Sequence, residues 1–220
     1  GTVLLSLISV ISINAIEIDS KLANAKKLAI ENLNREKINE SIPEIDSKRK
    51  EILKVLSVSS EIPYYEDVVA LVGAFQQVDY MPLLSMSLEK TSLFEHPYKN
   101  QISDKSMNEA MALLDNLPPI EYLNTSFVLL LEGYFGEANL LRTTGMARLE
   151  YYSINLEDRE MQNYYGWMEH GLQRHQELYH NYLVSIDEII DIYKRSSQYL
   201  KKNDYDYISK KNNPSLEEIQ

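Results

Sequence analysis

The feature that most constrains this chain is a series of apolar and aromatic residues at alternating steps of four and three. It runs without a break through the C-terminal part of the sequence, and all but two of its members are apolar or aromatic: Met161, Tyr165, Met168, Leu172, His175, Tyr179, Tyr182, Ile186, Ile189, Tyr193, Ser196 and Leu200. This spacing places side chains on one helix face, where they form a seam against a partner helix. We therefore expect one helix over residues 156–202, about 70 Å long.

A second series with helical spacing precedes the first and runs from Ile120 to Tyr152. The turn at Tyr152–Asn155 is expected to join the two helices into an antiparallel hairpin. Only seven Gly and seven Pro occur among 220 residues. This scarcity of turn residues argues against a sandwich or barrel of many short strands. The predicted fold class is all-α, an elongated helical bundle with long N-terminal and C-terminal helices.

Charge and cysteine content exclude several classes of function. The chain has 33 Asp plus Glu against 22 Lys plus Arg, a net charge of −11, and no basic stripe. Such a surface repels a phosphate backbone, so we expect no nucleic-acid partner. The absence of Cys excludes thiolate catalysis, zinc-thiolate sites and iron–sulfur clusters, since these require thiolates.

The first sixteen residues carry no charged side chain, and the first ionisable side chain is Glu17. We expect residues 1–18 to form an apolar anchor, a transmembrane or signal-anchor helix that contacts membrane lipid. The anchor side chains are Val3, Leu4, Leu5, Leu7, Ile8, Val10, Ile11 and Ile13. Two alternatives stay open, because the hydrophobic region of a secretory signal and a buried helix of a soluble bundle give similar patterns.

No Gly or Pro occurs between Gly1 and Pro43, and apolar residues continue at helical spacing as far as Leu33. A helix of about 40 residues is therefore expected to leave the membrane and join a helical bundle domain over residues 19–202. Residues 203–220 are polar and are expected to be a frayed tail. We expect the body to lie outside the cytoplasm, with the cytoplasmic face of the membrane as the alternative.

One polar group on the seam is a candidate site. If the hairpin is antiparallel, His175 lies level with Phe135 and within a turn of Glu137 and Tyr134. We predict a buried pair of His175 and Glu137, assisted by Tyr134. Such a pair can act as a pH-sensitive switch, because a carboxylate shifts the pKa of a histidine through the physiological range. The alternative is a core histidine that only fixes the hairpin register.

The sequence offers little for a metal or cofactor. Glu177 and His180 match the Glu-x-x-His spacing of di-iron bundles, but the motif occurs once and its residues flank the seam. No Gly-rich phosphate loop or nucleophile elbow is present. We therefore expect no cofactor and a non-enzymatic role, with a metal-dependent bundle enzyme as the lesser alternative.

Sixteen tyrosines are the remaining unusual feature of the composition. Tyrosine combines a rigid apolar ring with a polar tip, which suits half-exposed interfaces as well as a wet bundle core. We expect a membrane-tethered protein for protein–protein interaction or complex assembly, with a protein partner or a homo-oligomer. The alternative is a helical ligand-binding or sensor module with an apolar pocket. The candidate pocket or interface residues are Trp167, Met168, Tyr165, Tyr179 and Tyr182.

Overall fold

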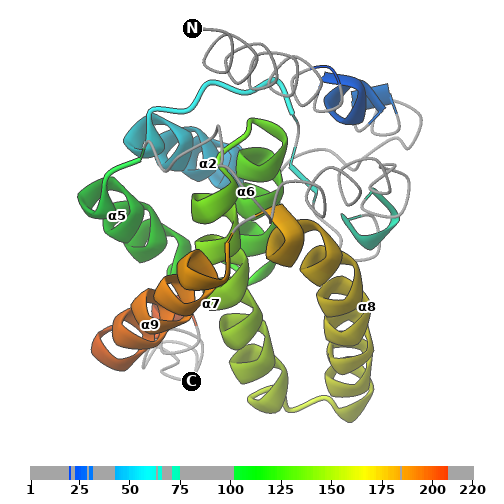
Figure 1. The fold of residues 1–220 in the computed structure, drawn as a ribbon. Helices are drawn as coiled ribbons and strands as arrows, with labels where there is room; N and C mark the ends of the chain where they lie inside the picture. The colour runs from blue at the N-terminus through cyan, green and yellow to red at the C-terminus, as the bar shows by residue number, and fades with distance from the viewer. Residues whose placement is uncertain are drawn as a thin grey trace, which may run out of the picture.

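The computed structural model describes residues 20, 23–28, 30–31, 43–62, 64–65, 71–74, 102–183 and 185–207. The regular structure in these ranges is helical, and they contain no strand. The predicted all-α class is therefore confirmed. The main helices, shown in Figure 1, are α2 (Pro43–Leu56), α5 (Asp104–Leu114), α6 (Ile120–Leu131), α7 (Phe135–Ile154), α8 (Arg159–Leu183) and α9 (Ile186–Lys202).

Helix α6 forms the centre of the fold, and all its residues are buried. It begins after two prolines, Pro118 and Pro119, as expected for residues with fixed φ at a helix start. It ends in a Schellman motif, in which Tyr134 N–H donates to Leu129 O at 2.9 Å and Gly133 N–H to Leu130 O at 3.1 Å. Gly133 has a φ of 87°, which glycine adopts without steric cost. This tight end turns the chain directly into α7.

Helices α6 and α7 pack closely along their length, while α2 and α5 pack together beside them (Figure 1). Two ion pairs hold α6 to earlier parts of the chain. Arg49 of α2 binds Glu121 through two bonds of 2.8 and 2.7 Å, and both side chains are buried. Lys26 lies 2.7 Å from Glu132 at the end of α6. The central helix is thus tied to α2 and to the helical residues 23–28.

The predicted hairpin of α7 and α8 is confirmed, since the two helices pack against each other. The rings of Tyr152 and Tyr165 meet edge to face with centroids 5.5 Å apart. Burial and the nearby carboxylate of Glu150 raise the pKa of Glu169. These neighbours place residue 175 level with about residue 143 rather than with Phe135, because the turn lies later in the chain than expected, after Ile154 rather than after Tyr152.

The prediction of one continuous helix over residues 156–202 is wrong. Helix α8 ends at Leu183, and Ser185 is extended, with φ −72° and ψ 162°. Ser185 and Glu188 form a capping box: the Ser185 hydroxyl accepts from Glu188 N–H at 3.3 Å, and the Glu188 carboxylate accepts from Ser185 N–H at 2.8 Å. This cap starts a new helix, and α9 packs on α7 instead of extending α8 (Figure 1). The elongated form of the bundle is therefore not confirmed.

The ends of the chain are only partly described. Residues 1–18, the predicted anchor, lie outside the described residues. Among the helices that are described, none combines the length and the apolar character needed to cross a membrane. The prediction of a frayed tail is wrong for residues 203–207, because Tyr205 is buried and Tyr207 N–H donates to Asp115 O at 2.8 Å. Residues 208–220 lie outside the described part.

Candidate functional site

Helix α9 carries the candidate site. The inner face of α9 holds this helix in place on the body. Ile192, Ser196 and Tyr199 are buried on this face. The hydroxyl of Thr144 on α7 donates to the hydroxyl of Ser196 at 3.0 Å. Apolar burial and a hydrogen bond thus act together to hold α9 on α7.

A cluster of buried polar groups beneath α9, the Asp115 cluster, adds a second attachment. Asp115 accepts two bonds from Arg148, at 2.9 and 3.0 Å. The hydroxyls of Tyr122 and Tyr199 each donate to the same carboxylate at 2.8 Å. Arg148 also donates to the backbone oxygen of Asn203 at 2.9 Å. The cluster therefore joins α5, α6, α7 and α9 at one carboxylate.

The electrostatics of the Asp115 cluster suit a structural role. Burial, followed by the charge of Asp115, raises the pKa of both Tyr122 and Tyr199 well above the ordinary value. Burial alone would lower the pKa of Arg148, but its hydrogen bonds and charge interaction with Asp115 raise it overall. The tyrosines stay neutral donors and the arginine stays charged. These groups bind one another, so they stabilise the fold rather than offer a free acid or base.

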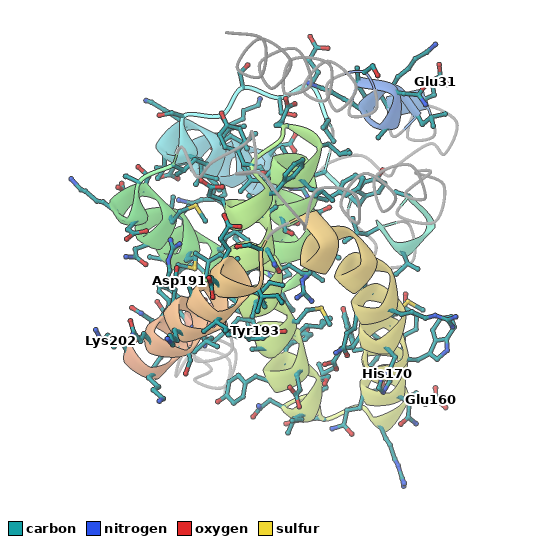
Figure 2. The ribbon with its side chains drawn as sticks, in the orientation of Figure 1. Glu31, Glu160, His170, Asp191, Tyr193 and Lys202 are labelled. Atoms are coloured by element: carbon teal, nitrogen blue, oxygen red, sulfur yellow. The ribbon has the colours of Figure 1, made fainter. Side chains whose placement is uncertain are left out.

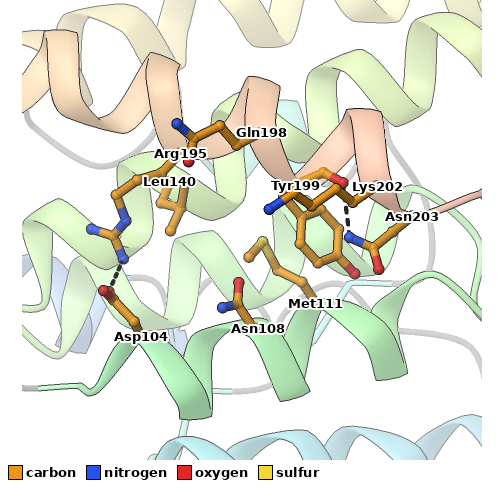
Figure 3. Close-up of a pocket in the computed structure, with 9 residues that line it drawn as sticks. All are labelled: Asp104, Asn108, Met111, Leu140, Arg195, Gln198, Tyr199, Lys202 and Asn203. Carbon is orange, nitrogen blue, oxygen red and sulfur yellow. Dashed lines mark hydrogen bonds and ion pairs between the residues drawn. The ribbon is translucent and has the colours of Figure 1, made fainter.

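A polar cleft of about 400 Å³ lies between α5 and α9. Figure 3 shows Arg195 of α9 reaching Asp104 of α5 at one end, where the ion pair measures 2.6 Å, with Lys202 at the other. Most lining side chains are polar or charged: Asp104, Asn108, Met111, Leu140, Arg195, Gln198, Tyr199, Lys202 and Asn203. A cleft of this size and lining can hold a small polar molecule.

Three large apolar side chains of α9 are open to solvent. Ile186 is 76 % exposed, Ile190 47 % and Tyr193 51 %. Steps of four and three residues put these side chains on one face, which we call the α9 stripe. Large apolar side chains that are exposed singly need no explanation, but three along one helix form a patch suited to a partner.

The predicted polar pair is only partly described. Glu137 is buried and its carboxylate accepts from Ile102 N–H at 3.1 Å, which ties the start of α7 to the residue preceding the α5 cap. Tyr134 is half-buried at the start of α7. His175 belongs to α8, but its side chain lies outside the described residues. The pair stays a prediction, although the hairpin register places His175 about two turns from the expected level.

The candidate pocket or interface residues are described only in part. Trp167 is 70 % exposed, whereas the adjacent Met168, about 100° away around α8, is 3 % exposed and faces the interior. Tyr165 is half-buried and contacts the rings of Tyr152 and Tyr164. The side chains of Tyr179 and Tyr182 lie outside the described residues. The exposed Trp167 therefore cannot share a closed pocket with Met168.

No group of three or more His, Asp or Glu side chains able to hold a metal ion occurs within the described ranges. No protein-family model matches the chain, and neither the curated proteins nor the solved structures contain a match.

Proposed function

We propose that this chain is a non-enzymatic helical protein that binds a protein partner through the α9 stripe. The observation that carries the proposal is the exposure of Ile186, Ile190 and Tyr193 along one face of a helix. Burying a large apolar side chain contributes about 1.5–3 kcal/mol, so a partner that covers the stripe gains substantial free energy. An amphipathic helix that lays its apolar face on another protein is a recurrent recognition mode.

The attachment of α9 to the body supports this role. Its inner face bonds to Thr144 and Asp115, and Arg195 pairs with Asp104 of α5. A helix held at several points presents its outer face in a fixed position. Binding through such a helix loses less conformational entropy than binding through a mobile segment.

The proposal includes a membrane tether through residues 1–18 and a body outside the cytoplasm. The uncharged run up to Glu17 supports the tether. We also propose an elongated bundle with a long N-terminal helix. Small-angle scattering tests this shape through the radius of gyration. A compact chain of this length has a radius of gyration of about 17 Å, and a clearly larger value is expected. Recovery of the full chain in a high-salt soluble fraction would contradict the tether.

Site-specific photo-crosslinking tests the docking role. A photo-reactive phenylalanine analogue replaces Ile190 in the native host, and the same analogue replaces the exposed Lys50 of α2 as the control. We expect a discrete crosslinked product from position 190 and none from position 50. Absence of a product at both positions would contradict docking through the stripe.

A second candidate function is ligand binding in the polar cleft. The volume of about 400 Å³ and the cations Arg195 and Lys202 favour a small polar molecule with a carboxylate or phosphate group. This differs from the apolar pocket expected from the sequence. Thermal-shift measurements with small anions, compared between the native chain and Lys202→Ala, test it. Elemental analysis of the native protein separately tests the metal-dependent enzyme alternative.

A further inference from the structure

The charges along α9 are arranged with opposite signs in its two halves. Asp187, Glu188 and Asp191 lie in the N-terminal half, and Lys194, Arg195, Lys201 and Lys202 in the C-terminal half. Figure 2 shows Asp191 and Lys202 toward opposite ends of the helix. The α9 stripe therefore lies on a helix that is acidic at one end and basic at the other.

Two of these charges lie on the same side of the stripe. Asp187 and Lys194 are seven residues apart, so at about 100° per residue they differ by only about 20° around the helix axis. Both side chains are exposed. Neither makes an ion pair with another of the described residues. Each is available to a partner helix that covers the stripe.

We propose that the partner of the α9 stripe is a second copy of this chain, with the two α9 helices antiparallel about a two-fold axis near Ile190. This inference rests on the proposed docking function and names the partner. In an antiparallel pair, the flank that carries Asp187 and Lys194 in one copy lies on the same side of the contact as the equivalent flank of the other copy. A two-fold axis near Ile190 then brings Asp187 of each copy beside Lys194 of the other. The apolar residues meet in the middle, and two equivalent ion pairs form at the edge.

The same charges disfavour other arrangements. In a parallel pair related by a two-fold axis, the flanks that carry Asp187 and Lys194 lie on opposite sides of the contact, so these two charges cannot pair between the copies. An anionic lipid surface would be repelled by Asp187, Glu188 and Asp191, which lie in the half that carries most of the stripe. The inner face of α9 is not available, because Ile192, Ser196 and Tyr199 are buried within the body.

A contact limited to one helix from each copy is small, so we expect weak association with a Kd on the order of micromolar or weaker. Sedimentation equilibrium of the full chain in nonionic detergent measures it. Lys194→Glu or Asp187→Lys replaces two attractive pairs by two repulsive ones. Each variant is expected to weaken association by about tenfold. Lys50→Glu makes the same charge change as Lys194→Glu on α2 and is expected to leave the Kd unchanged.

Recombining the charges gives the decisive measurement. In an equal mixture of the two variants, a heterodimer places Asp187 of the Lys194→Glu chain beside Lys194 of the Asp187→Lys chain. The two substituted side chains, a glutamate and a lysine, then lie beside each other as well. Heterodimers are therefore expected at the native affinity. The chain that carries both substitutions is also expected to dimerise, since it exchanges the two charges. Failure of both to restore association would overturn the antiparallel pair, and circular dichroism confirms that each variant is folded.

The crosslink from position 190 separates this inference from the proposed function. A product with the mass of two chains supports the second copy. A product of another mass, with a native chain that sediments as a monomer, overturns the second copy while the docking function stands. No product and a monomeric chain would overturn both.

Discussion

The carboxylate of Asp115 and the guanidinium of Arg148 face each other in the interior, with Nε to Oδ1 at 2.9 Å and Nη2 to Oδ2 at 3.0 Å. The two residues come from adjacent parts of the body, the end of α5 and the middle of α7. Arg148 also lies over the ring of Tyr205, 5.2 Å from its centroid. This pair therefore joins the end of α5 to α7 and holds the chain after α9 in position.

We predict that Arg148→Met destabilises the fold by about 3–5 kcal/mol, because it leaves the buried charge of Asp115 without a cation. The free energy of urea unfolding, followed by circular dichroism, measures the loss. Arg159→Met at the exposed start of α8 is the control and is expected to change stability by less than about 0.5 kcal/mol. A loss of less than about 1 kcal/mol in Arg148→Met would show that the pair contributes little.

The buried tyrosines predict a loss of stability at alkaline pH. Burial is the main cause that raises the pKa of Tyr64, Tyr122, Tyr199 and Tyr205 above the usual value of 10.0. Above about pH 10 these phenols ionise in the unfolded chain but stay protonated in the fold, so the unfolded state binds fewer protons. Their contribution is complete below that pH and is lost as the pH rises through the folded-state pKa values.

Each such tyrosine lowers the free energy of unfolding by up to about 1.4 kcal/mol per pH unit above pH 10. Urea unfolding at a series of alkaline pH values measures the slope. Tyr205→Phe is expected to reduce the slope by the share of one tyrosine. A constant free energy of unfolding up to about pH 11 would be incompatible with this view.

Much of the fold follows from residue spacing. The steps of three and four between Ile120 and Tyr152 predict α6 and α7 as helical, and the start of α8 follows from the polar turn after Tyr152. The pattern did not reveal that two helices meet at Gly133, because apolar residues on both sides of this turn keep a helical period. Periodicity reports which residues are buried, and a chain can bend between buried segments.

The break between α8 and α9 had a signal in the sequence. Ser185 is followed three residues later by Glu188, the spacing of a capping box. The long series of apolar residues obscured it, since Tyr182, Ile186 and Ile189 continue the steps through the cap. In the fold, α9 turns Ser196 inward and Ile186 outward. The residues that formed one predicted seam are thus divided between a core face and the α9 stripe.

The Asp115 cluster was not predicted, although charged residues inside apolar runs indicated it. Asp115 follows Leu113 and Leu114, and Arg148 precedes Leu149. A charge at such a position needs a buried partner of opposite sign. The sequence does not show which partner it finds, because the pairing depends on where the tertiary fold places the end of α5 relative to α7. The same limit applies to Arg49 and Glu121, which are 72 residues apart.

The pair of Arg49 and Glu121 gives a third prediction, for the attachment of α2 to α6. Arg49→Met or Glu121→Leu alone leaves one buried charge and is expected to cost about 3–5 kcal/mol, whereas the double variant removes both charges and is expected to regain most of the loss. A double-mutant cycle of unfolding free energies measures the difference. If the two single losses simply add in the double variant, the buried pair does not act as a unit.

The contact of α6 and α7 depends on the missing side chain of Gly145. A Cβ at this position would lie 2.5 Å from Cβ of Tyr122 and 3.4 Å from Cδ2 of Leu123. The Cβ of Tyr122 is attached directly to the backbone of α6, so it can withdraw only if the helices separate. That separation would also move the Tyr122 hydroxyl away from Asp115. We predict that Gly145→Ala destabilises the fold by about 1–3 kcal/mol.

The matched control for this prediction is Gly166→Ala in α8. No atom lies within 4 Å of a Cβ at Gly166, so alanine adds no clash there. Because alanine is the better helix former, this variant is expected to gain up to about 1 kcal/mol. Urea unfolding of both variants compares the same chemical change in a closed and an open position. A gain in stability from Gly145→Ala would mean that α6 and α7 are not in the close contact on which the position of the Asp115 cluster, and so of α9, depends.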